Sequence, residues 1–382
     1  MRSASILAAG FAAVAQAATV SVSGTPEGFA ASVTGGGSAE AVYPTTTDEL
    51  VSYLTDSEAR VIVLQQTFDF TGTEGTTNGS GCAPWGTDAA CQQAINKDDW
   101  CTNYEPDAPT VSVTYDNAGL NPIKVASDKT ILGDGASGVI KGKGLYLANG
   151  VENVIIQNIR ITELNPQYVW GGDAITLAGT DLIWIDHVTT DQIGRQHIVL
   201  GEAASNRVSI TNCNIDGEAT YSATCDGYHY WNLYFTGSND QITFKNNYVH
   251  HFSGRAPKLG GNTLLHAVNN YWYESSGHGF EVLDGAYVLA EGNVFGDVST
   301  IYEDGDSTTV YTVNDAQGEA ACSSYLGRAC VSNSFSNSGT FSFSDTSVLS
   351  KFTSSDSVAA AAEVSTVTGL SSTAGHGTIS SA

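Results

Sequence analysis

From about residue 150, the sequence repeats one form: a short strand rich in β-branched residues, a polar residue at its end, and a second short strand. The repeated segments are NVIIQNIRIT, DLIWIDHVTT, NRVSITNCNI, DQITFKNNYV, TLLHAVNNYW and AYVLAEGNVF. Their polar residues recur at intervals of 28, 26, 35, 23 and 23 residues, and they are Asn158, Asp186, Asn212, Asn247, Asn270 and Asn293. A period in the twenties with one strand-turn-strand unit per repeat is typical of a solenoid.

Short strands with alternating apolar residues favour an all-β fold, the right-handed parallel β-helix. One coil alone cannot bury its apolar face, whereas stacked coils place Val, Ile and Leu side chains in one continuous interior. We expect the turn asparagines to adopt left-handed backbone and to hydrogen-bond to their counterparts one coil away. The alternative fold, an antiparallel β-sandwich, requires regular two-residue hairpin turns, and these are scarce in the sequence.

The segments on either side of the repeats complete one domain, because no proline-rich or charged linker divides residues 20–382. An amphipathic pattern over residues 47–54, with Thr47 and Glu49 near its start, predicts a short helix that caps the open N-terminal end of the solenoid. The longest interval between repeats predicts a loop over residues 220–232. From about residue 335 the chain is rich in Ser and Thr, and we expect a tail that packs loosely along the coils or is partly disordered.

The first 19 residues are typical of a secretory signal peptide: a basic start, a short apolar run, and the small-x-small site Ala15-Gln16-Ala17. No later segment contains the roughly 18 apolar residues that a membrane span needs. We therefore expect a secreted, extracellular and soluble monomer. The sequon at Asn78 lies in a Gly/Thr-rich stretch, which we interpret as a loop that could accommodate a glycan.

Cysteine usage supports an exported protein, since seven cysteines in such a chain indicate disulfides with one thiol left over. Cys213 lies in a strand-like stretch and is the best candidate for the buried free thiol. Cys82, Cys91 and Cys101 share one loop region, and Cys322 and Cys330 could close a short loop. Sequence alone does not set the pairing of the six disulfide candidates, which are Cys82, Cys91, Cys101, Cys225, Cys322 and Cys330.

The charge balance restricts the ligand, because 15 Lys and Arg residues face 40 Asp and Glu residues, giving a net charge of −25. Such a surface repels nucleic acid, anionic lipid and strongly acidic polymers. A polysaccharide ligand should be largely uncharged or be met by a local basic patch. The stretch HHFSGRAPK supplies such a patch, because Arg255 and Lys258 flank Pro257, which fixes the local backbone. The preceding His250 and His251 should point to opposite faces of a strand, so we expect no metal shared between them.

Four motifs, in order and on this repeat, resemble the fungal pectin lyases of the pectate lyase superfamily: WGGDAITL (170–177), WIDHVTT (184–190), GRQHIV (194–199) and SGRAPKLGG (253–261). The resemblance runs from about residue 20 to about residue 350. It implies β-elimination within methyl-esterified homogalacturonan: a base removes the proton at C5, and the O4 glycosidic bond breaks to leave a 4,5-unsaturated product. Such a site needs a base and positive charge near the developing enolate oxygen.

By this resemblance Arg255 is the base, and Lys258 supports it or binds the carboxyl group of the substrate. A guanidinium has an ordinary pKa above about 12, so the site must depress it strongly, or Arg255 stabilises charge while another group takes the proton. The calcium-dependent pectate branch uses carboxylates to hold Ca²⁺. Here Asp173 matches one ligand position, but Arg195 stands where that branch has an acid, and Gly260 replaces a second arginine. The resemblance therefore implies an Asp173–Arg195 ion pair, no metal and no other cofactor.

The aromatic residues that the resemblance places in the substrate cleft are Trp85, Trp100, Tyr104, Trp170 and Trp231. Aromatic rings offer flat apolar faces to sugars and methyl esters. We expect Trp184 and Trp272 to pack in the core, and Asp186 and His187 to brace the wall of the catalytic site. SGHGF around His278 has the Gly-His-Gly of polygalacturonases without their other motifs, and we interpret it as a turn. The alternatives are a Ca²⁺-dependent pectate lyase and a non-catalytic polysaccharide-binding β-helix.

Overall fold

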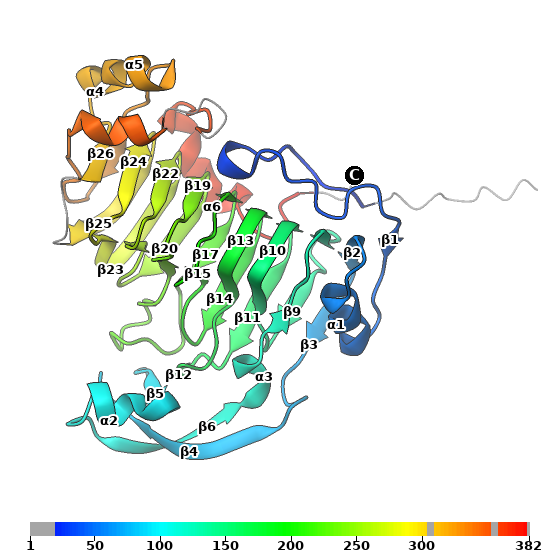
Figure 1. Cartoon of the computed structure of the whole chain (residues 1–382). Helices are drawn as coiled ribbons and strands as arrows, with labels where there is room; N and C mark the ends of the chain where they lie inside the picture. The colour runs from blue at the N-terminus through cyan, green and yellow to red at the C-terminus, as the bar shows by residue number, and fades with distance from the viewer. Residues whose placement is uncertain (1–19, 304–308, 353–357, 380–382) are drawn as a thin grey trace, which may run out of the picture.

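The computed structural model describes residues 20–303, 309–352 and 358–379. The proposed signal peptide lies outside these residues. Within them the chain coils into a right-handed parallel β-helix, as the repeat predicts, with three stacked sheets around one continuous apolar interior (Figure 1). Strands of successive coils pair in parallel, for example Ile183 of one coil with Val208 of the next, which excludes the antiparallel β-sandwich.

The first sheet carries the candidate site on its outer face. It contains β7 (Ile123–Lys124), the starts of β10 (Leu145–Gln157) and β13 (Ile175–Asp186), β15 (Ile198–Leu200), β18 (Leu233–Phe235), β21 (Lys258–Leu259), and the ends of β23 (Tyr271–Val282) and β25 (Val294–Glu303). The second sheet contains β1 (Ala41–Val42), β2 (Arg60–Leu64), β8 (Lys129–Gly133), the ends of β10 and β13, β16 (Val208–Thr211), β19 (Gln241–Lys245), β22 (Leu264–Val268), β24 (Tyr287–Glu291) and β26 (Val310–Thr312). The third sheet contains β3 (Thr67–Asp69), β9 (Val139–Lys141), β11 (Arg160–Leu164), β14 (Thr189–Ile193), β17 (Asn214–Asp216), β20 (Tyr248–Phe252), the starts of β23 and β25, and β27 (Ser334–Ser336).

The turn from the second to the third sheet contains one residue with left-handed backbone in successive coils, and these residues are Asn158, His187, Asn212, Asn246, Asn269 and Gly292. The predicted polar column is therefore wrong in register, because Asp186 precedes this position and Asn247, Asn270 and Asn293 follow it. These last three form a buried ladder. The Asn247 side-chain amide donates to Asn270 Oδ1 at 3.0 Å, and the Asn270 amide donates to Asn293 Oδ1 at 3.1 Å. Because these side chains lie one coil apart, they satisfy each other's hydrogen bonds in the buried interior.

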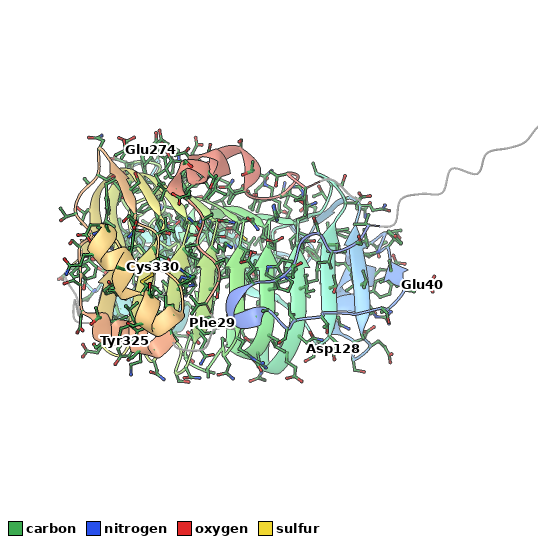
Figure 2. The ribbon with its side chains drawn as sticks, turned by 90° about the horizontal axis from the view of Figure 1, so that it is seen from above. Phe29, Glu40, Asp128, Glu274, Tyr325 and Cys330 are labelled. Carbon is green, nitrogen blue, oxygen red and sulfur yellow. A yellow bond between two sulfur atoms is a disulfide. The ribbon has the colours of Figure 1, made fainter. Side chains whose placement is uncertain are left out.

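Helices cover the N-terminal end of the solenoid and, near the other end, the outer face of the second sheet. Helix α1 (Thr47–Thr55) buries Leu50 and Leu54 against the first coils, as predicted for a cap, and the Thr46 side chain accepts from the Glu49 amide. At the far end, α4 (Ala316–Ala321), α5 (Ser323–Leu326) and η4 (Thr346–Phe352) pack over β24 and β26. Figure 2 shows these helices, marked by Tyr325 and Cys330, on the same face as the N-terminal segment between the labels Phe29 and Glu40, which follows the start of η1 (Gly28–Ala30).

The Ser/Thr-rich tail packs along the coils. It contains η6 (Val364–Gly369) and α6 (Leu370–Thr373). Beyond them the Gly375 amide donates to the Asn212 carbonyl and the Gly377 amide to Asn158 Oδ1, both at 2.7 Å. None of the helices among the described residues is both long and apolar enough to cross a membrane.

A smaller sheet lies beside the β-helix, at the bottom of Figure 1. It contains β4 (Thr76–Cys82), β5 (Gln93–Ile95), β6 (Thr110–Asp116) and β12 (Tyr168–Val169), accompanied by η2 (Lys97–Asp99), α2 (Trp100–Tyr104) and α3 (Asn117–Leu120). The expectation of a loop at Asn78 is wrong, since Asn78 is an exposed residue in the middle of β4, paired with Thr114.

The disulfides are Cys82–Cys101, Cys91–Cys225 and Cys322–Cys330. The first two fasten the smaller sheet, and the second ties it to the long loop at 220–232. Cys213 is the buried free thiol, as predicted, and burial raises its pKa far above the ordinary range.

Candidate active site

The two cations of the basic stretch lie at the edge of the first sheet: Lys258 is in strand β21, and Arg255 is in the turn that leads into it. Lys258 begins β21, and its side chain points outward because the next residue, Leu259, fills the interior. Arg255 stands in the turn just before, with left-handed backbone (φ 44°). In the parallel register Lys258 lies between Tyr234 on β18 and Glu281 on β23.

Aromatic rings enclose the guanidinium of Arg255. Its central carbon lies 4.7 Å from the ring centroid of Trp231, 5.1 Å from that of Tyr234 and 5.7 Å from that of Tyr230. Its Nε is buried without a hydrogen-bond partner, and Arg255 forms no salt bridge with any described residue. Burial lowers the pKa of Arg255 below its usual value; Tyr230 and the carboxylate of Glu281 act against this lowering, and the charge of nearby Arg195 adds to it.

Unlike Arg255, Lys258 pairs with a carboxylate among the described residues. Its Nζ lies 2.7 Å from Glu281 Oε2. Burial alone would raise the pKa of Glu281, but hydrogen bonds from His278 and Lys258 outweigh burial and hold that pKa at about 2. The ring nitrogen Nε2 of His278 lies 2.8 Å from Glu281 Oε1. The interpretation of His278 as a turn residue is wrong, because it lies within β23 and contacts the acid that holds Lys258.

The expected ion pair between Asp173 and Arg195 is present, with Arg195 Nη1 at 3.5 Å from Asp173 Oδ2. The pair lines a pocket of about 220 Å³ together with Lys97, Tyr146 and Trp170. A guanidinium has only donors, so with Arg195 in this place the two residues do not fit a Ca²⁺ site.

Hydrogen bonds from two buried groups fix the positions of Arg195 and Asp173. The backbone amide of Gln196 donates to Asp173 Oδ1 at 2.8 Å, and His229 Nε2 donates to the Arg195 carbonyl at 2.7 Å. Burial lowers the pKa of His229 to about 4, so the ring stays neutral at this carbonyl near neutral pH. Sequence reasoning missed His229, since it lies in the long loop and meets Arg195 only through the stacking of coils.

The four tryptophans expected in the cleft form one contiguous run. Ring centroids are 6.0 Å apart for Trp170 and Trp100, 6.3 Å for Trp100 and Trp85, and 5.8 Å for Trp85 and Trp231. Tyr104 stacks on Trp100 at 6.2 Å and is 71% exposed. By contrast Trp184 and Trp272 are buried, as predicted.

A glutamine that the sequence did not single out connects the run of tryptophans to the catalytic pocket. Gln92 is fully buried; its Oε1 accepts from Trp231 Nε1 at 3.2 Å, and its Nε2 donates to the Gly194 carbonyl at 3.0 Å. Its neighbour Cys91 is fixed by the disulfide to Cys225. No motif marks Gln92, because its side-chain partners lie 74 to 139 residues away in the sequence.

Two sequence expectations about histidines need correction. Asp186 and His187 do not brace the catalytic wall; they line a separate pocket with Glu27 of the N-terminal segment, at the turn between the second and third sheets. The premise that His250 and His251 face opposite ways is also wrong. Their Nδ1 atoms are 2.8 Å apart, because the left-handed backbone of His251 (φ 53°) breaks the alternation of the strand.

Comparisons with known proteins agree with this architecture. The sequence pattern of the family described as pectate lyase matches residues 107–368. The chain is 63% identical over 366 residues to the probable pectin lyase A of Neosartorya fischeri, covering 96% of this chain and 97% of that relative. It is 61% identical over 366 residues to pectin lyase B of Emericella nidulans, with coverage of 96% and 97%. Among solved structures, pectate lyase II of Xanthomonas campestris matches 92% of this chain and 98% of its own, with a TM-score of 0.55 at 18% identity, a likeness that concerns the fold alone.

Proposed function

We propose a function for this chain, which belongs to the pectate lyase family and, within it, to the fungal pectin lyases. It is a polysaccharide lyase that degrades pectin. The finer proposal is that it acts outside the cell as a monomer, on methyl-esterified homogalacturonan, without a metal or another cofactor. The product is then a set of 4,5-unsaturated oligogalacturonides released from plant cell wall pectin.

The contrast between Arg255 and Lys258 is the observation that carries this proposal. Arg255 is enclosed by three aromatic rings, has no carboxylate partner among the described residues, and has a lowered pKa. Lys258 faces the carboxylate of Glu281. Of the two cations, Arg255 is therefore the one whose deprotonation burial makes easier, and Lys258 is the one paired with a carboxylate.

These roles give a balanced elimination. Neutral Arg255 takes the proton from C5, the electron pair of that C–H bond becomes the C4–C5 double bond, and the C4–O4 bond breaks with its pair on O4. The departing oxygen takes a proton from water. Lys258 stabilises the negative charge that develops on the ester carbonyl oxygen as the C5 proton leaves. A methyl ester favours this step, because an ionised carboxylate would resist further negative charge.

The Asp173–Arg195 pair supports the preference for esters. Paired with Asp173, Arg195 leaves little net charge at this position, where a free carboxylate would need a neutralising cation. The adjacent run of tryptophans offers apolar faces to sugar rings and methyl groups.

Ultraviolet absorbance of the unsaturated uronate product tests the proposal. Highly methylated pectin and polygalacturonate are compared, each with chelator and with added calcium. We expect absorbance to rise on methylated pectin in the presence of chelator. Activity confined to polygalacturonate with calcium would overturn the ester preference, and no absorbance on either polymer would overturn elimination itself. Amino-terminal sequencing of the mature protein tests secretion, with a start near residue 20 expected.

A further inference from the structure

Four residues that face outward from the first sheet lie in register on successive strands. Tyr234 pairs with Lys258, Lys258 with Glu281, and Glu281 with Glu303. Side chains at paired positions of adjacent parallel strands lie one above the other on the same face. The backbone of the β-helix therefore sets one acid directly beside Lys258 and a second acid one coil further.

His278 connects the two acids. Its Nε2 lies 2.8 Å from Glu281 Oε1 and 3.1 Å from Glu303 Oε2. Both neighbours of this nitrogen are carboxylates, which only accept hydrogen bonds while ionised, so Nε2 carries the proton. The Tyr230 ring packs edge-on against the imidazole, with centroids 5.9 Å apart. The charged groups around His278 among the described residues are thus Glu281, Glu303 and, behind them, Lys258 and Arg255.

Glu281 is the pivot of this arrangement. It is 7% exposed, and its two oxygens are divided between two partners: Oε2 faces Lys258 at 2.7 Å and Oε1 faces His278 at 2.8 Å. With both oxygens engaged, the carboxylate has little freedom to turn. Glu303, by contrast, keeps half of its side chain in solvent and has one described partner in His278.

We propose that Glu281 is a positioning residue for the elimination: it fixes the position of the Lys258 ammonium on the outer face of the first sheet, and His278 with Glu303 holds Glu281 in turn. This inference rests on the proposed function, because it assigns a role in that reaction. The ammonium sits on a flexible four-carbon stem, so it has no fixed position without a partner. Without the Glu281 carboxylate, Lys258 moves away from the carbonyl oxygen whose charge it stabilises.

Replacing Glu281 tests this role in the whole enzyme on methylated pectin. We expect Glu281→Gln to lower kcat about 10- to 100-fold with little change in KM, because a displacement of about 1 Å in a charged group costs this much in the reaction step. Glu281→Asp keeps the charge and should recover part of the loss. Equal kcat in wild type and Glu281→Gln would overturn the proposal.

A double-mutant cycle separates positioning from a general structural effect. If Glu281 acts through Lys258, Glu281→Gln should cost almost nothing in a Lys258→Gln background. A loss of the same size in both backgrounds would show that Glu281 acts independently of Lys258, and the proposal would fail. Wild-type enzyme without any unsaturated product would instead refute the proposed function, so the two failures are distinguishable.

The chain supplies a matched control for removing a buried acid from a histidine. Glu291 lies 2.8 Å from His266 Nε2, the same separation as in the Glu281–His278 pair, but it belongs to the second sheet beneath the C-terminal helices. Glu291→Gln should leave kcat per folded molecule unchanged. A second pair tests the histidine: His278→Gln keeps a donor for Glu281 and should retain more activity than His278→Leu. Equal loss in both His278 variants would contradict a hydrogen-bonding role for this residue.

Discussion

Arg195 and Arg255 stand at opposite ends of one run of tryptophan rings. The guanidinium carbon of Arg195 lies 4.2 Å from the ring centroid of Trp170, and that of Arg255 lies 4.7 Å from the ring centroid of Trp231. Trp100 and Trp85 complete the run between them. Each cation is therefore shielded on one side by an aromatic face, which limits its hydration in an otherwise acidic protein.

Shielding by Trp231 predicts the pH dependence of the reaction. Burial lowers the pKa of Arg255. Trp231→Leu admits water, so this pKa should rise, the neutral fraction at a given pH should fall, and the rising limb of kcat against pH should move to higher pH. At a fixed pH on that limb, each unit of displacement lowers kcat about tenfold. The measurement is the pH–rate profile on methylated pectin. Trp85→Leu is the control, because Trp85 contacts Trp231. This variant should raise KM but should not shift the rising limb of kcat along the pH axis. No displacement in Trp231→Leu would contradict Arg255 as the base.

The Asp173–Arg195 pair predicts an engineered metal site. Arg195→Asp replaces a cation by a second carboxylate facing Asp173, and paired carboxylates are the ligands that Ca²⁺ prefers. We expect the variant to bind calcium in a titration calorimeter and to lose activity on methylated pectin. Arg195→Gln serves as the control and should lose activity without binding calcium. If Arg195→Asp binds no more calcium than Arg195→Gln, Arg195 does not stand in for a metal.

The fold could be predicted from the sequence because a solenoid repeats its signal. Each coil has the same short apolar strands, so the period and the interior residues are visible without any long-range information. The register of the polar column could not be read in this way. Asp186, Asn212 and Asn247 all stand at or just after the end of a strand, and only the left-handed residue of each turn, such as His187 or Asn246, shows that they occupy different positions.

The site residues that lie in short sequence motifs could be predicted, whereas those brought together by the stacking of coils could not. Arg255 and Lys258 lie in one short motif, and Asp173 and Arg195 each lie in another. Glu281 and Gln92 carry no local signal, since their importance arises from strand register and from a disulfide-anchored loop. His278 was visible as part of a motif, but its partner Glu303 lies on the next coil, which a single repeat does not reveal.

The asparagine ladder predicts a large loss of stability from one substitution. Asn270 is fully buried, accepts from the backbone and side chain of Asn247, and donates to the Phe244 carbonyl. Asn270→Ala leaves several of these groups unpaired, at about 1 to 3 kcal/mol for each. We expect a clearly lower urea midpoint. Asn262→Ala, which breaks the exposed amide contact with Asn239, is the control and should change stability by about 0.5 kcal/mol or less. Similar midpoints for the two variants would contradict the role of the ladder.

Glu291 predicts how stability falls in acid. It is fully buried on β24, with His266 at 2.8 Å and Arg328 Nη2 at 2.6 Å. Burial alone would raise the pKa of Glu291, but hydrogen bonds from His266 and Arg328 outweigh it and lower the pKa from an ordinary 4.5 to about 2. A carboxyl group with a lower pKa in the folded state contributes stability above the unfolded value, and this contribution is lost as the pH falls from 4.5 toward 2.

Glu291→Gln should therefore lower the melting temperature most at neutral pH, where Arg328 loses its buried counter-charge, at a cost of about 3 to 5 kcal/mol. The two melting curves should approach each other as the pH falls from 4.5 toward 2, because the wild type then loses what the variant already lacks. Calorimetric melting temperatures between pH 7 and pH 2 measure this, with the exposed Glu40→Gln as control, which should follow the wild type throughout. Curves for wild type and Glu291→Gln that stay parallel over the whole range would show that Glu291 does not carry the acid sensitivity. In that case the carboxylates paired with the buried lysines, such as Asp56 with Lys129, become the groups to replace next.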